Sequence, residues 1–137
     1  MEFSGKKVTV VGTGISGIGA VGLLNAVGAE VVLYDGNEKL KIEDIEKKLG
    51  TYKAEIVLGE LTKELTDSSD LLVISPGVPI DSPVVKAFEA AGVPVWGEVE
   101  LAYAFDKGKV LAITGTNGKT TTTALVGQIV GAYHKDT

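Results

Sequence analysis

The sequence has 137 residues, no cysteine and a formal net charge of -5 at pH 7. A chain of this length buries one ordinary core, and 45% hydrophobic with 23% charged residues is a globular composition. The negative charge argues against a general nucleic-acid or anionic-membrane surface, and the lack of cysteine excludes disulfides and thiolate metal sites. No apolar run reaches a membrane span of roughly 18 residues, and residues 1–7 lack a signal-peptide core, so we expect a cytoplasmic protein.

Residues 7–28 join a predicted strand to a predicted helix through a glycine-rich turn. The strand is the β-branched run Val8–Val11, the turn reads GTGISG at 12–17, and apolar residues then recur at helical spacing as far as Gly28. In a dinucleotide-binding unit, the first glycine permits the turn, the second lets the backbone approach a diphosphate, and the third allows close helix packing. The pattern therefore predicts an anion site at the N-terminus of this helix.

Asp35 follows the second predicted strand, Glu30–Tyr34, and lies 18 residues after Gly17. An acidic residue at about this spacing contacts the ribose or base of a bound nucleotide. The alternative is that Asp35 stabilises an Asx-turn at the end of the strand. The upstream glycines favour the ligand-facing interpretation.

The remaining predicted elements of the first hundred residues alternate between helix and strand. We expect helices at 42–49, 61–69, 82–91 and 98–105, and strands at 55–58, 71–74 and 93–96. Ser82 is the expected N-cap of the third of these helices, and Pro94 indicates an edge strand. Glu98 and Glu100 point to different helix faces, so we expect them to stabilise the helix N-terminus and not to form a catalytic pair.

Five strands alternating with helices predict a doubly wound parallel sheet of Rossmann-like type, with strand order 3-2-1-4-5. Ligands of such sheets bind at the carboxyl ends of the strands, where the strand order reverses. This arrangement would bring Gly12–Gly17, Asp35 and Ser75–Gly77 along one crevice.

A second glycine-bearing loop follows a short linker at 106–108. We expect a strand at Lys109–Thr114, a phosphate loop, and a helix from about Lys119 to Val130. The candidate ATP-binding residues are Gly115, Thr116, Asn117, Gly118, Lys119, Thr120 and Thr121. In a P-loop the backbone N–H groups cradle phosphates, the lysine reaches the β- and γ-phosphates, and the Thr120 hydroxyl would hold Mg²⁺. Ile113 stands where a strict P-loop has glycine.

The segments VVGTGISGIG, ISPGVP, GEVEL and ITGTNGKTTT together resemble the Mur ligases of peptidoglycan precursor synthesis. The resemblance covers essentially the whole chain and implies that residues 1–106 bind the UDP part of a substrate. It implies that residues 107–137 begin an ATP-binding domain. The UDP-binding residues that it implies are Gly14, Ile15, Ser16, Gly17, Asp35, Gly36 and Gly77. Family members often carry a larger polar or basic residue near Asn37, so this chain departs from the family there.

The resemblance also implies the reaction, in which ATP and Mg²⁺ drive addition of D-glutamate to UDP-N-acetylmuramoyl-L-alanine, with Lys119 and Thr120 as catalytic residues. The complete ligase is expected to be monomeric. The family's central domain continues beyond its phosphate loop, so we expect the 137 residues alone to be inactive. An unpaired strand within 109–137 is expected to promote self-association.

Two other functions remain open from the residues. The NAD-binding domain of an oxidoreductase would explain GTGISG and Asp35, but it leaves the loop at 115–121 without a purpose. A non-catalytic nucleotide-binding module would need a complete ligand pocket and no chemistry.

Overall fold

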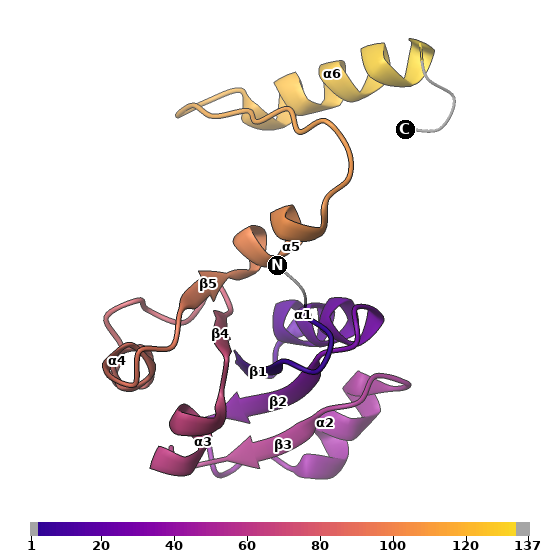
Figure 1. The fold of residues 1–137 in the computed structure, drawn as a ribbon. Coiled ribbons are helices and arrows are strands. Elements are labelled where there is room, and N and C mark those ends of the chain that lie inside the picture. Colours follow the sequence, from indigo (N-terminus) through magenta and orange to yellow (C-terminus); the bar gives the residue numbers. More distant parts are fainter. Residues whose placement is uncertain (1–2, 134–137) are drawn as a thin grey trace. The chain divides into compact units, whose positions relative to one another are not determined.

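The computed structural model describes residues 3–133, which form two compact units divided between Asp106 and Lys107. The first unit contains five strands and five helices, drawn in Figure 1. The strands are β1 (Lys7–Val11), β2 (Glu30–Asp35), β3 (Glu55–Leu58), β4 (Leu71–Ile74) and β5 (Val95–Gly97). The helices are α1 (Ile15–Ala26), α2 (Ile42–Leu49), α3 (Lys63–Ser68), α4 (Pro83–Ala90) and α5 (Glu98–Phe105).

The five strands form one parallel sheet in the order β3-β2-β1-β4-β5, which confirms the predicted fold class and strand order. Central β1 pairs with β2 on one side and with β4 on the other, so that Val10 lies opposite both Leu33 and Val73. Strand β5 is an edge strand, as Pro94 indicated. The order reverses at β1, which places the β1–α1 loop at the switch point of the sheet.

Alternate residues of each central strand pack into different layers, as the two-residue period of a strand requires. Val8, Val10 and their neighbours on β2 and β4 pack with α1, α2 and α5. Val11, Tyr34 and Leu72 belong to the second layer, which contains α3 and α4. Helices α1 and α2 lie on one side of the sheet and α3 and α4 on the other (Figure 1). Because both faces are covered, the strands read as continuous apolar runs.

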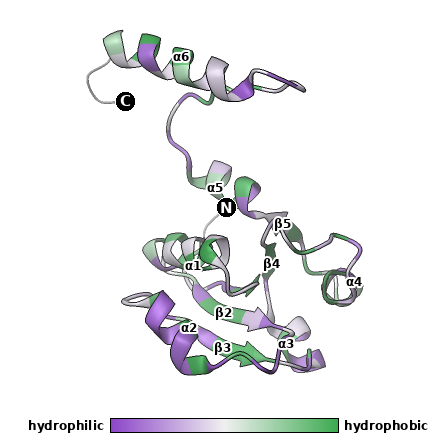
Figure 2. Cartoon of the chain, turned by 180° about the vertical axis from the view of Figure 1, so that it is seen from behind, coloured by the Kyte–Doolittle hydropathy of each residue, from purple (hydrophilic) through white to green (hydrophobic). Residues whose placement is uncertain are grey.

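The hydropathy of helices α1 and α2 follows the number of residues that each buries. Much of α2 is hydrophilic in Figure 2, because only Ile45 and Leu49 of this helix are buried. Helix α1 is mainly hydrophobic or neutral, and it buries four residues against the sheet. Packing against the sheet, more than intrinsic propensity, therefore stabilises these short helices.

A buried polar contact joins the central strand to the loop after α3. The Thr9 side chain is fully buried, and its Oγ1 lies 2.8 Å from Ser69 Oγ. Ser69 Oγ donates to the Leu65 carbonyl at 2.7 Å, so Thr9 is the donor of the first contact. Both hydroxyls are thus satisfied inside the second layer.

The structure modifies one predicted helix cap. Ser82 occupies the N-cap position of α4, but its side chain makes no capping hydrogen bond and its buried Oγ has no partner among the described residues. Pro83 supplies no N–H at the first helical position, so the helix has one donor fewer to cap. The structure thus confirms the predicted start of this helix, which Ser82 precedes without a side-chain capping bond.

The second unit contains α6 (Lys119–Tyr133), which confirms the predicted helix. The predicted strand at 109–114 is wrong, because these residues form neither helix nor strand. A strand exists only through pairing with another strand, and residues 107–133 of this unit contain none. None of residues 107–133 is buried, and Leu111, Leu125 and Ile129 are each more than half exposed. Within 3–133, no helix is long and apolar enough to cross a membrane.

Candidate functional site

The β1–α1 loop turns sharply at Gly12, which has a φ of 106° and donates its N–H to the Tyr34 carbonyl at 2.9 Å. A Cβ atom at Gly17 would lie 1.9 Å from the Gly12 carbonyl oxygen, far inside van der Waals contact. The first and third positions of the motif therefore require glycine for different physical reasons. Gly12 supplies a backbone conformation that side-chain-bearing residues rarely adopt, and Gly17 allows α1 to approach the turn.

The tip of the loop is open to solvent. Gly14 is the N-cap of α1, and a Cβ placed on it would meet no atom within 4 Å. Ile15 is 96% exposed, and Ser16 is also exposed. The first N–H groups of an α-helix have no partner within the helix and carry the positive end of its dipole. The backbone at 14–17 is thus arranged to accept an anion.

Asp35 is bound to the loop by hydrogen bonds. Its Oδ2 accepts from the Thr13 backbone N–H at 3.3 Å and from the Thr13 hydroxyl at 2.9 Å, while Oδ1 accepts from the Asn37 N–H at 3.1 Å. The contact to Asn37 is the Asx-turn that the sequence offered as an alternative. A carboxylate has about four acceptor positions, so these three contacts leave room for one more donor.

Two further residues around Asp35 were not singled out from the sequence. Lys48 of α2 donates from Nζ to the Thr13 carbonyl at 3.5 Å. The only sequence signal for it is its position three residues after buried Ile45, at the border of an apolar stripe. Tyr34 donates its hydroxyl to the Gly59 carbonyl at 2.8 Å, and burial, with a smaller effect of the Asp35 charge, raises the pKa of Tyr34 above its ordinary value.

On the other side of β1, Ser75 follows the last residue of β4 and contacts the glycine turn. Its Oγ lies 3.0 Å from the position that a Cβ at Gly12 would take, and its N–H donates to the Val11 carbonyl at 3.3 Å. Ser75 Oγ donates to Glu98 Oε1 of α5 at 2.9 Å. Gly77, two residues further, is exposed, with no atom near its Cβ position.

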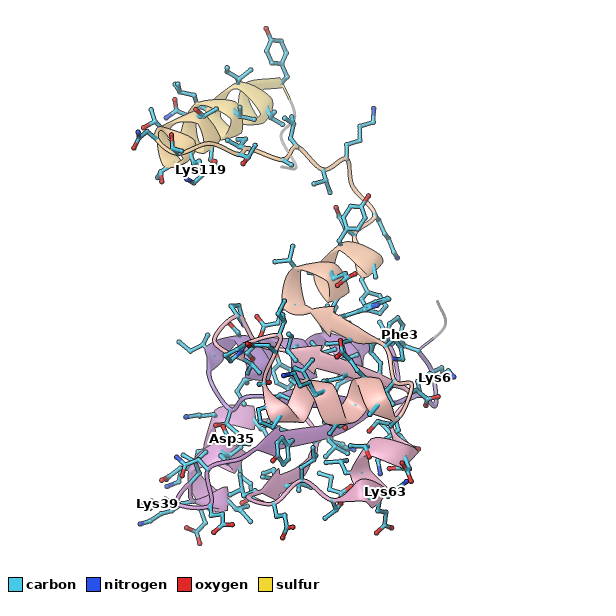
Figure 3. All side chains as sticks on the ribbon, turned by 90° about the vertical axis from the view of Figure 1, so that its left-hand side faces the viewer. Phe3, Lys6, Asp35, Lys39, Lys63 and Lys119 are labelled. Carbon is cyan, nitrogen blue, oxygen red and sulfur yellow. The ribbon has the colours of Figure 1, made fainter. Side chains whose placement is uncertain are left out.

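The carboxyl ends of β1, β2 and β4 therefore bring together the three stretches that the sequence placed along one crevice. Figure 3 shows Asp35 and Lys39 at one end of the first unit, with Phe3 and Lys6 at the other end. Gly36 also lies at the Asp35 end, and its Cβ position is 3.7 Å from the Tyr34 hydroxyl. The structure brings the predicted site residues of the first unit to the same edge of the sheet.

The second loop has the backbone of a glycine turn. Gly115 and Gly118 have φ values of 150° and 77°, and the Lys119 ammonium donates to the Gly115 carbonyl. Thr122 donates its N–H to the Gly118 carbonyl at 2.9 Å, which begins α6. Residues 115–121 are all exposed. Within residues 3–133 no group of three or more His, Cys, Asp or Glu side chains could hold a metal ion.

The parallel sheet and the glycine turn at its switch point define a Rossmann-like domain. The sequence model for "Mur ligase MurD-like, N-terminal domain" matches residues 6–97. The chain belongs to this family.

Curated relatives agree with that assignment. The chain is 66% identical over 137 residues to UDP-N-acetylmuramoylalanine–D-glutamate ligase of Lachnospira eligens, covering 100% of this chain and 30% of that protein. It is 56% identical to the protein of the same name from Lachnoclostridium phytofermentans, covering 98% of this chain and again 30% of the relative. The chain thus spans about 30% of the length of these curated relatives.

Among solved structures, a pseudomurein peptide ligase type C from Methanothermus fervidus superposes with a TM-score of 0.58 at 27% identity. That match covers 93% of this chain and 26% of the ligase. Shikimate dehydrogenase from Aquifex aeolicus gives a TM-score of 0.52 at 16% identity, covering 74% of this chain and 45% of that protein. The second likeness shows a shared fold alone.

Proposed function

We propose that the chain is the N-terminal part of an ATP-dependent ligase that adds D-glutamate to UDP-N-acetylmuramoyl-L-alanine. Its first unit, residues 1–106, would bind the UDP moiety. The observation that carries the proposal is the meeting of the glycine turn, Asp35 and Ser75–Gly77 at the switch point of a MurD-like domain. The names of the relatives supply the reaction class.

In this proposal the diphosphate binds at the start of α1. The N–H groups of Ile15, Ser16 and Gly17 and the Ser16 hydroxyl would donate to it, and Gly14 lets the backbone come close because it carries no Cβ. Asp35 and Gly36 would contact the uracil, and Gly77 would border the same pocket. Asn37 directs its Oδ1 to the Lys39 N–H at 3.1 Å, so it has a turn-stabilising role of its own.

Residues 107–137 would begin the ATP-binding domain; the last four lie outside the described residues. Gly115–Thr121 would cradle the phosphates of ATP, with Lys119 leaving the Gly115 carbonyl to reach the β- and γ-phosphates. The Thr120 hydroxyl would be a Mg²⁺ ligand, and Mg²⁺ supplies neutralisation of charge on the transferring phosphoryl oxygens. The complete protein would work in the cytoplasm, where nucleotide-linked precursors and ATP are found.

Acyl transfer requires the substrate carboxylate, the γ-phosphate and the amine to be held together. These 137 residues contribute one loop for the γ-phosphate, and we expect no D-glutamate-dependent release of ADP from them alone.

Calorimetric titration tests the binding part of the proposal. The 137-residue chain should bind UDP and UDP-N-acetylmuramoyl-L-alanine, and should bind NAD more weakly than either. NAD is the matched competitor because the same turn geometry serves dinucleotides in other Rossmann-like domains. Tighter binding of NAD would refute the proposal and favour the oxidoreductase alternative.

A further inference from the structure

Strand order determines how an extended UDP-sugar can lie along the carboxyl edge of the sheet. Strands β2 and β4 flank β1 on opposite sides, and a UDP-sugar is a linear series of base, ribose, diphosphate and sugar. With the base at Asp35 after β2 and the diphosphate at the β1–α1 loop, the sugar lies beyond β1, beside β4 and β5. This direction rests on the proposed function.

On that side Ser75 lies against the glycine turn, and its hydroxyl is bonded to Glu98. Ser75 Oγ lies 3.0 Å from the Cβ position of Gly12 and 3.4 Å from that of Gly17, so its hydroxyl contacts the turn itself. Glu98 Oε1 accepts the Ser75 proton at 2.9 Å, and the Glu98 side chain is half-buried. Ser75 follows β4 and Glu98 follows β5, and their side chains form one polar pair beside the glycine turn.

The hydrogen-bonding direction within this pair decides what it can bind. Because Ser75 donates its only proton to Glu98, the pair presents oxygen lone pairs and a negative charge. Phosphate oxygens are acceptors and are repelled by such a pair, whereas hydroxyl and amide N–H groups are attracted. The Ser75–Glu98 pair therefore fits the hydroxyl and amide N–H donors of a sugar and does not fit a phosphate group.

Helix α5 holds Glu98 in place. Leu101, one turn further, is 1% exposed in the first core layer, and the Phe105 ring packs on Phe3 with centroids 4.8 Å apart. Glu100 has a different task, since its Oε2 accepts from the Gly97 N–H at 3.3 Å. The two carboxylates, which were predicted to share a capping role, thus differ: Glu100 caps the helix, and Glu98 bonds to Ser75.

We propose that Glu98, positioned by Ser75, is a specificity residue that accepts a hydrogen bond from a hydroxyl or amide N–H of the sugar attached to UDP. Its negative charge weakens the binding of UDP alone and is compensated when the sugar donates to it. The residue thereby favours the complete UDP-sugar over the free nucleotide.

The test compares the affinities of UDP and UDP-N-acetylmuramoyl-L-alanine for the 137-residue chain and its variants by calorimetry. The sugar gain is the ratio of the affinity for UDP-N-acetylmuramoyl-L-alanine to the affinity for UDP. Glu98→Ala should lower this ratio about tenfold or more, because a hydrogen bond to a charged group contributes that much to binding. The same variant should bind UDP alone equally or more tightly. Glu98→Gln keeps an acceptor for Ser75 and removes the charge, so it should strengthen UDP while reducing the sugar gain less than alanine does.

Glu100→Gln is the matched control, because it removes the same charge from the same helical turn. It should leave both affinities close to those of the parent chain. Thermal unfolding of each variant checks that α5 remains folded, and Glu98→Gln provides the answer if Glu98→Ala unfolds.

Three results would overturn the inference: no sugar gain in the parent chain, equal losses for UDP and UDP-sugar in the Glu98 variants, or identical behaviour of Glu98→Gln and Glu100→Gln. Failure of the parent chain to bind UDP at all would instead refute the proposed function.

Discussion

The contact between Gly17 and the Gly12 carbonyl makes the first helix sensitive to a single methyl group. In Gly17→Ala, the added Cβ would stand 1.9 Å from a backbone oxygen, whereas ordinary contacts are 3.4–4 Å. Neither partner is a flexible side-chain end, so α1 or the turn must move by more than an ångström. Overpacking of this kind costs roughly 1–3 kcal/mol, and a backbone clash belongs at the upper end.

The substitution also has a favourable component, which must be subtracted. Alanine in a helix is more stable than glycine by about 0.5–1 kcal/mol. The net loss is therefore about 2 kcal/mol in the free energy of unfolding. For a unit of roughly 100 residues this corresponds to a fall of about 8–16 °C in the melting temperature.

Urea and thermal unfolding followed by circular dichroism measure this loss. Gly19→Ala is the matched control, because Gly19 lies in the same helix and its Cβ position has no neighbour within 4 Å. It should gain about 0.5–1 kcal/mol. The two substitutions are chemically identical and two residues apart, yet they should shift stability in opposite directions. Equal stability of Gly17→Ala and Gly19→Ala would refute the reasoning from close approach.

Three further predictions concern other parts of the chain. Asp35→Ala should weaken UDP binding by about 1–3 kcal/mol, whereas Thr13→Val, which removes one hydrogen bond to Asp35, should weaken it less; equal losses would mean that Asp35 acts only through the loop. Hydrogen bonds from the Lys6 side chain and the Lys7 N–H, together with the Lys6 charge, lower the pKa of Asp70 below its ordinary value of 3.8. Its contribution to stability is therefore present above pH 3.8 and lost as the pH falls through the lowered pKa, so the melting temperature of Asp70→Asn should depend less on pH between about 2 and 5; parallel curves would contradict this. Light scattering should detect concentration-dependent association of the whole chain but not of residues 1–107, because Leu111, Leu125 and Ile129 are exposed; two monomeric samples would dismiss association in solution.

The sequence by itself determined the elements that depend on a local residue pattern or on burial of both faces of a strand. Strands β1, β2 and β4 were recognisable because a strand buried on both faces is apolar at consecutive positions. Glycines 28, 50 and 92 follow predicted helices, and each has a positive φ that side-chain-bearing residues avoid. The strand order was expected from the alternation of strands and helices, and it brought the glycine turn, Asp35 and Ser75 to one edge.

Only the tertiary structure decided features that depend on a distant partner. Residues 109–114 have a strand-like composition, yet they form no strand because pairing requires a neighbour that residues 107–133 do not provide. The sequence was compatible with Asp35 as a ligand contact and as an Asx-turn residue. The folded structure shows the Asx-turn, because the Asn37 N–H donates to Asp35 Oδ1. Glu98 and Glu100 looked alike in sequence. Their separate contacts depend on β4 and α5 meeting at the switch point, since the position of Ser75 relative to Glu98 is a property of the folded sheet and not of the spacing between them.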